Sequence, residues 1–181
     1  MSTVKIIPYI LFFGSLFSSV FAQNAAQSPL SQGKALVQAG KWAEAIGPLK
    51  TISQNQFSVP EGEKASVLLV ECYLREHKRA EAQKVVARFL EFYSASVYRE
   101  RMEVASATLQ IENGAVYEGV ETLLRVLTYT KNPAAYVEAK DVAIQTLAVS
   151  LLSAGELFSL LEKYPVDREI NGWLHLQLGR E

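Results

Sequence analysis

The side chains that most often carry catalysis or bind metals are scarce in this chain of 181 residues. There is one cysteine, Cys72, and there are two histidines, His77 and His175. A serine–histidine–aspartate arrangement would need Asp141 or Asp167, and Asp167 stands where it would cap a predicted helix. We therefore predict no catalytic residues, no metal site and no cofactor, and expect that the protein is not an enzyme.

Each of these side chains has a simpler structural explanation. Cys72 lies in a mostly apolar predicted helix, where a cysteine usually packs as a small hydrophobic residue. His77 falls at a predicted turn, and His175 has no Cys, Asp or Glu at ligand spacing on its helix face. The composition, 49% hydrophobic and 20% charged with a net charge of −1, is typical of a folded domain. It gives no electrostatic basis for binding nucleic acid or an anionic membrane.

Small residues recur at one place in a series of predicted helical hairpins. Ala45, Ala82 and Gly119 follow one another at steps of 37 residues. A fixed period of this length is typical of a helical-repeat array, in which each hairpin buries its apolar side against the next. The alternative is three unrelated hairpins with chance spacing. We predict an all-α fold of antiparallel helix-turn-helix repeats stacked as a right-handed superhelix, an α-solenoid.

Caps, turn residues and apolar periodicity divide this array into about four helix pairs. Three of the pairs have a glycine between their two helices. These are Gly40 in the first pair, Gly114 after Asn113 in the third and Gly155 in the fourth. The predicted helices are 29–39 and 42–53, 61–76 and 79–93, 97–112 and 116–130, and 133–153 and 156–163. The expected organisation is a linker over 23–28, a repeat domain over 29–166 and a C-terminal helix within 167–181 that starts a further repeat or caps the array.

The first 22 residues have the features of a secretory signal peptide. Lys5 supplies a positive charge, residues 6–17 are apolar, and small residues precede the predicted cleavage between Ala22 and Gln23. The alternative is an uncleaved membrane anchor, although the whole apolar run, residues 6–22, has seventeen residues and is at the short limit for a span. We expect an exported protein with no integral membrane span after cleavage.

The residues around the predicted turns resemble the tetratricopeptide repeat. The first unit follows that family's order of a glycine inside the first helix and then glycine, aromatic and alanine across the turn: Gly33, Gly40, Trp42 and Ala45. The second unit keeps Tyr73 and Ala82 but has His77 in place of the turn glycine. The third keeps Gly114 but has Gly119 in place of alanine, and the period exceeds the family's usual value of about 34 residues.

Together with the signal peptide, the chain is similar to envelope tetratricopeptide proteins of Gram-negative bacteria, such as the outer-membrane assembly lipoprotein and the Tol-Pal coordinator. Residues 151–181 look like the helical N-terminal region of penicillin-binding-protein activators and related periplasmic solute-binding-like proteins. The resemblance implies a non-enzymatic scaffold, periplasmic or secreted, that binds another envelope protein or peptide. The alternatives are an N-terminal module whose ligand domain is missing from this chain, and an accessory to an envelope enzyme.

In tetratricopeptide arrays the first helix of each pair lines a concave face that binds partner peptides. Carried onto this chain, the resemblance implies contacts from Lys34, Gln38, Glu71, Arg75, Arg101, Thr108 and Glu112. The basic members of this set, Lys34, Arg75 and Arg101, could hold a carboxylate. The alternative is a solvated charged surface.

The last predicted helix keeps large apolar residues on more than one side: Trp173, Leu174, Leu176 and Leu178. A solenoid normally ends in a unit with a polar outer face, because an exposed apolar face associates. We therefore expect the C-terminal helix to be an interaction surface, for self-association or for a missing domain.

Overall fold

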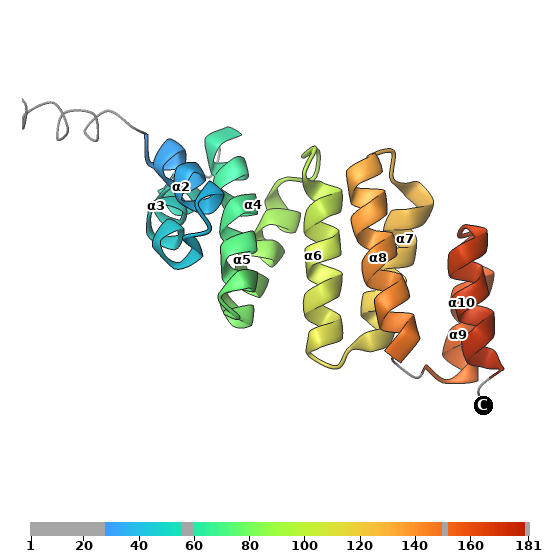
Figure 1. Ribbon diagram of the computed structural model, residues 1–181. Coiled ribbons are helices and arrows are strands. Elements are labelled where there is room, and N and C mark those ends of the chain that lie inside the picture. The colour runs from blue at the N-terminus through green and yellow to red at the C-terminus, as the bar shows by residue number, and fades with distance from the viewer. Residues whose placement is uncertain (1–27, 56–59, 150–151, 180–181) are drawn as a thin grey trace, which may run out of the picture.

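The computed structural model describes residues 28–55, 60–149 and 152–179, and these ranges contain helices and turns but no strand (Figure 1). In chain order the helices are α2 (Pro29–Gln38), α3 (Trp42–Asn55), α4 (Pro60–Arg75), α5 (Arg79–Phe92), α6 (Arg99–Glu112), α7 (Val116–Tyr129), α8 (Pro133–Val149), α9 (Ala154–Lys163) and α10 (Arg168–Leu178). The expected all-α class is confirmed. The predicted signal peptide and its cleavage position at Ala22 and Gln23 lie outside the described residues. In the part that is described, no helix is both long and apolar enough to cross a membrane.

The helices lie in two layers. From α2 to α7 each helix packs on the one that follows it, and α10 packs on both α8 and α9. Contacts also join α2 to α4, α6 to α8, α8 to α10 and α7 to α9. The first helices of the pairs therefore form one layer and the second helices the other. Figure 1 shows α6 and α8 side by side, with α7 behind α8.

One turn geometry recurs between the two helices of three pairs. Gly40, His77 and Gly114 have positive φ angles of 71°, 55° and 88°, and their positions are 37 residues apart. In each turn the N–H of this residue donates to the carbonyl three residues earlier, and the next N–H donates to the carbonyl five residues earlier. This is the Schellman arrangement, which satisfies the last carbonyls of a helix. The turns thus follow the same period as Ala45, Ala82 and Gly119.

We expect His77→Gly to raise the free energy of unfolding by about 1 kcal/mol, because a left-handed backbone conformation is costly for a residue with a Cβ. The His77 side chain is exposed, so little packing is lost with it. The matched control is Gly114→Ala, whose added Cβ would meet nothing within 4 Å, so that only the backbone preference changes. Urea unfolding should show opposite shifts for the two variants. Equal stability of His77→Gly and the unchanged protein would contradict this account.

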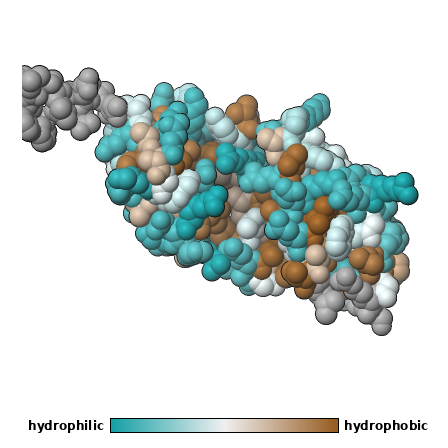
Figure 2. All heavy atoms as spheres, viewed as in Figure 1, coloured by the Kyte–Doolittle hydropathy of each residue, from teal (hydrophilic) through white to brown (hydrophobic). Residues whose placement is uncertain are grey.

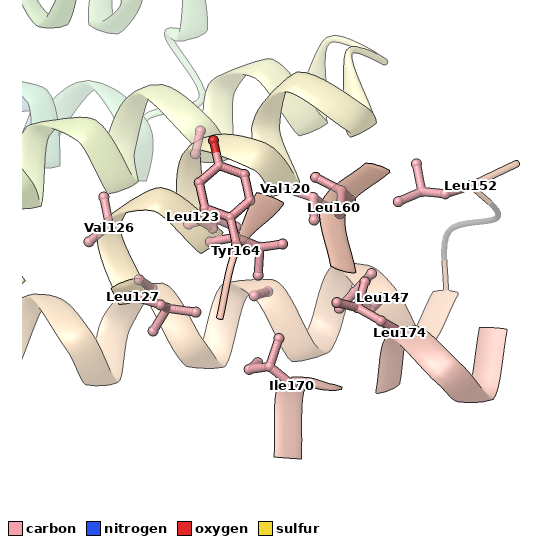
Figure 3. Close-up of a cluster of buried hydrophobic side chains, with 14 of the residues drawn as sticks. Val120, Leu123, Val126, Leu127, Leu147, Leu152, Leu160, Tyr164, Ile170 and Leu174 are labelled. Atoms are coloured by element: carbon pink, nitrogen blue, oxygen red, sulfur yellow. The ribbon is translucent and has the colours of Figure 1, made fainter. Parts of the chain in front are cut away.

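Two groups of buried side chains fill the space between the layers. The first runs from α2 to α6 and includes Leu49, Phe89 and Met102. The second runs from α6 to α10, and Figure 3 shows Leu147 of α8 close to Leu174 of α10 within it. Because α6 contributes to both groups, the two groups are joined through this helix.

The small residues singled out in the sequence lie where helices approach closely. Ala45 and Ala82 are fully buried. A Cβ added to Gly119 would lie 2.9 Å from the carbonyl oxygen of Ala107, on the partner helix α6. A Cβ added to Gly33 would lie 2.5 Å from Leu49 Cδ2. At Gly119 the contact is with the backbone of α6, so a side chain there would require one of the two helices to shift, whereas at Gly33 the contact is with the side chain of Leu49.

The predicted boundary between the helices of the fourth pair was wrong. Gly155 does not separate them, because α9 begins at Ala154 and includes Gly155 in its first turn. Ser153 is the N-cap: its hydroxyl accepts from Glu156 N at 3.4 Å, and the Glu156 carboxylate accepts from Ser153 N at 2.7 Å. This reciprocal capping box satisfies two free N–H groups, which outweighs the cost of a glycine in the first turn.

Asp167 caps α10, as its position in the sequence predicted. Its Oδ1 accepts from the N–H groups of Glu169 and Ile170, both at 3.0 Å. Its Oδ2 accepts from Lys140 Nζ at 2.8 Å and from the Tyr136 hydroxyl at 2.5 Å, so the same carboxylate ties α10 to α8. Burial alone would raise the pKa of Asp167, but the hydrogen bonds from Lys140 and Tyr136 hold it well below its usual range.

Candidate functional site

A groove of about 400 Å³ opens where α4, α6 and α8 lie next to one another. Four of the predicted contact residues line it: Glu71, Arg75, Arg101 and Thr108. Its apolar surface comes from Val67, Val70, Leu74, Met102, Ala105 and Val142. The lining residues recur every three or four positions along α4 and α6, so one stripe of each helix faces the groove. Figure 2 shows apolar surface mixed with hydrophilic surface in the middle of this side of the molecule.

Arg101 stands between two carboxylates in this groove. Its guanidinium lies 3.6 Å from Glu71 Oε2 on α4 and 3.8 Å from Glu138 Oε2 on α8. Burial raises the pKa of Glu138, while the charge of Arg101 opposes that rise. A partner carboxylate would therefore compete with Glu71 and Glu138 for Arg101, so that this residue alone does not make the groove an anion site.

Arg75 is the second basic side chain of the groove, at the C-terminal end of α4. Its guanidinium carbon lies 5.6 Å from the centroid of the Trp42 ring, which is a cation–π distance. Trp42 is half-buried and packs against the N-terminal core group. Arg75 forms no ion pair with another residue of the described ranges. Its charge is therefore open to a ligand.

The other predicted contact residues lie outside the groove. Lys34 and Gln38 are exposed on α2 and do not line it. Glu112, at the end of α6, forms an ion pair with Arg79 of α5 instead. The structure therefore brings together the members of the predicted set on α4 and α6 and separates those at the two ends.

Two residues of the groove, Glu138 and Val142 of α8, were missed by the sequence prediction. The resemblance to the repeat motif is loose over α8, so it implies no contact residue on this helix. The period itself points to them, because Glu138 and Val142 follow Arg101 and Ala105 by 37 residues. A search by period rather than by motif would have found both.

The side chains considered for chemistry lie apart from one another. Cys72 is buried, and burial together with the charge of Glu71 raises the pKa of its thiol to about 11, so the thiol stays protonated. His77 and His175 are exposed, on a turn and on α10. Within the described ranges, no three His, Cys, Asp or Glu side chains come together as metal ligands would.

Comparisons with protein-family models, with characterised proteins and with solved structures found no match to this chain. The geometry of the groove between α4, α6 and α8 is therefore the observation that bears most directly on function.

Proposed function

We propose that this protein is a tetratricopeptide-like, non-enzymatic scaffold of the bacterial envelope, which binds a segment of another protein in the groove between α4, α6 and α8. The observation that carries the proposal is the groove itself, because it is lined by the first helices of three successive pairs. Recurrence of the same turn at Gly40, His77 and Gly114 supports a repeat array. In such an array the pairs stack as a right-handed superhelix with the groove on its concave face.

The lining of the groove indicates the kind of segment that it binds. Leu74, Ala105 and Val142 are half-buried and offer an apolar surface for one or two apolar side chains of the partner. Arg75 at one end supplies a cation without an ion-pair partner among the described residues, which favours a carboxylate at that end of the segment. We therefore expect a short segment with apolar side chains in the middle and an acidic residue or a chain end near Arg75.

The proposed location follows from residues 1–22. Signal cleavage between Ala22 and Gln23 would release the array, residues 29–166 with the C-terminal helix, into the periplasm of a Gram-negative cell or to the exterior. Mass measurement of the protein purified from cells would test the cleavage position directly.

A second candidate rests on the outer surface of α10. A shallow hollow there is lined by Arg168, Glu169, Gly172, Trp173 and Leu176. The side chain of Leu176 is 50% exposed. In this candidate the chain corresponds to the helical N-terminal region of a penicillin-binding-protein activator or a solute-binding-type protein. The hollow would then contact a ligand domain, or a second copy of the chain by self-association.

We expect Thr108→Arg to abolish capture of the partner, because the long side chain would fill the groove beside Arg101. Thr108 is half-buried, and its hydroxyl bonds only to Val104 O of its own helix, so the substitution leaves the packing between helices intact. The control is Gln83→Arg, which adds the same side chain at an exposed position of α5, away from the groove. The measurement is affinity capture from envelope extracts, with mass spectrometry of the proteins retained. If Thr108→Arg retains the same partner as Gln83→Arg, the groove is not the binding site.

A further inference from the structure

The hollow on α10 and the groove belong to the same layer of helices. The groove is lined by α4, α6 and α8, and the hollow by residues of α10 alone. Helices α6, α8 and α10 follow one another in one row, and each packs on the next (Figure 1). Whether the two sites also share a face depends on the side that α10 turns toward α8.

The buried residues of α8 and α10 show which side this is. Three buried residues have the same spacing, i, i+4 and i+7, on the two helices: Ala139, Ala143 and Thr146 on α8, and Ile170, Leu174 and Gln177 on α10. The groove residues Glu138 and Val142 stand directly before the first two of the α8 set. Glu169 and Trp173 of the hollow stand directly before the first two of the α10 set. Equal positions on a helix point the same way relative to its buried stripe, so the hollow lies on the side of α10 that corresponds to the groove side of α8.

Ion pairs between neighbouring helices agree with this orientation. Arg101 of α6 lies 3.8 Å from Glu138 Oε2, so the groove stripe of α8 borders α6. Lys140 Nζ of α8 lies 2.8 Å from Glu169 Oε2, so the stripe of Glu169 and Trp173 borders α8 in the same way. The groove and the hollow therefore follow one another along one face of the array.

The hollow offers an apolar contact on this face. Leu176 is 50% exposed, and Trp173 is half-buried against the C-terminal core group. Gly172 lies between them on the helix surface, and a Cβ added there would meet nothing within 4 Å. An apolar side chain of a ligand can therefore lie over the backbone at Gly172, with Trp173 and Leu176 beside it.

The surface of α8 between the two sites carries negative charge. Between the flank with Glu138 and the flank with Lys140, α8 exposes Val137 and Asp141. Asp141 forms no ion pair with another residue in the described ranges. A segment that crosses α8 at this place is favoured if it carries a basic rather than an acidic residue there.

We propose that the hollow is a second subsite for the segment bound in the groove, which continues across α8 and places an apolar side chain over Gly172, against Trp173 and Leu176. This inference rests on the proposed function and makes the bound segment longer than the groove alone requires. Neighbouring helices lie about 8–10 Å apart, so the step from α6 to α10 is about 20 Å, which an extended segment covers in about six residues. The partner segment thus carries two apolar positions about six residues apart, with a basic residue favoured between them.

The test is selection of binding peptides on the purified protein from a phage-displayed library of about twelve random residues, which is longer than the expected span. The selected sequences should share two apolar positions about six residues apart. Leu176→Lys places a charge in the hollow and should weaken binding of a selected peptide about tenfold, measured by fluorescence anisotropy of the labelled peptide. The control is Phe158→Lys, which places the same charge on α9 at a residue that is 62% exposed and outside the hollow, and it should bind the peptide unchanged.

Thr108→Arg separates failure of this inference from failure of the proposed function. If the selected peptides lose affinity for Thr108→Arg but bind Leu176→Lys as tightly as the unchanged protein, the groove binds a segment and its extension to α10 is wrong. If they depend on Leu176 but not on Thr108, the hollow binds by itself and the extension is again wrong. If no sequence is enriched, both proposals fail. If sedimentation shows that the unchanged protein self-associates and Leu176→Lys does not, a second copy occupies the hollow and the inference is overturned.

Discussion

Replacement of Leu174 by alanine is expected to lower the free energy of unfolding by about 2–5 kcal/mol. Leu174 of α10 is fully buried, and it shares a core group with Leu147 of α8 and Leu160 of α9 (Figure 3). The substitution would leave a cavity enclosed by three helices, which cannot all close on it at once. The expected loss is a large fraction of the stability of an ordinary domain.

The control for this variant is Leu176→Ala, on the same helix two residues away. Leu176 is 50% exposed, so its replacement should change the free energy of unfolding by less than about 0.5 kcal/mol. Urea unfolding followed by circular dichroism measures both. Equal stability of the two variants would mean that α10 does not dock on α8 and α9 in solution, despite the links from Asp167 to Tyr136 and Lys140.

The C-terminal helix was expected to be an interaction surface, but only some of its apolar residues are accessible for one. Leu174 is used inside the core, and Leu178 is half-buried against it. Of the apolar residues singled out in the sequence, Trp173 and Leu176 remain to line the outer hollow of α10. Any self-association or domain contact through this helix therefore has to use that pair, and it would leave Leu174 untouched.

The helices and their turns were predictable because the signals that end a helix are local. Gly40 and Gly114 indicate turns because glycine adopts a positive φ angle without steric cost, and both residues have positive φ. His77 adopts the same conformation without that freedom, so only its place 37 residues from each glycine indicates the turn. At Gly155 the local signal misled, because the capping box of Ser153 and Glu156 determines where α9 begins.

The candidate site was less predictable, since it depends on which side chains meet across three helices. The resemblance to the repeat family placed Glu71 and Arg75 of α4 among the expected contacts, and both line the groove. Spacing within one helix does not show that Arg101 lies between two carboxylates, because Glu138 comes from another helix. Pairing across helices is a property of the fold and has no signal in a single segment.

Ala82→Leu is expected to lower the free energy of unfolding by about 1–3 kcal/mol, through overpacking where α4 and α5 cross. Ala82 is fully buried and belongs to the N-terminal core group. The equivalent position one period later, Gly119, shows how close such a crossing is, since even a Cβ there would lie 2.9 Å from the Ala107 carbonyl oxygen. At Ala82 one methyl group fits, and the three further carbons of leucine would have to separate the helices or take a strained rotamer.

The matched control is Glu81→Leu, which introduces the same side chain one residue earlier on α5. Glu81 is exposed, and its carboxylate lies in the first turn of α5, where a negative charge interacts favourably with the N-terminus of the helix. Its loss should cost less than about 1 kcal/mol. Thermal and urea unfolding of both variants measure the difference. If the two are equally stable, the recurrence of small residues at Ala45, Ala82 and Gly119 does not reflect close helix crossings, and the 37-residue period would then rest on the turns at Gly40, His77 and Gly114 alone.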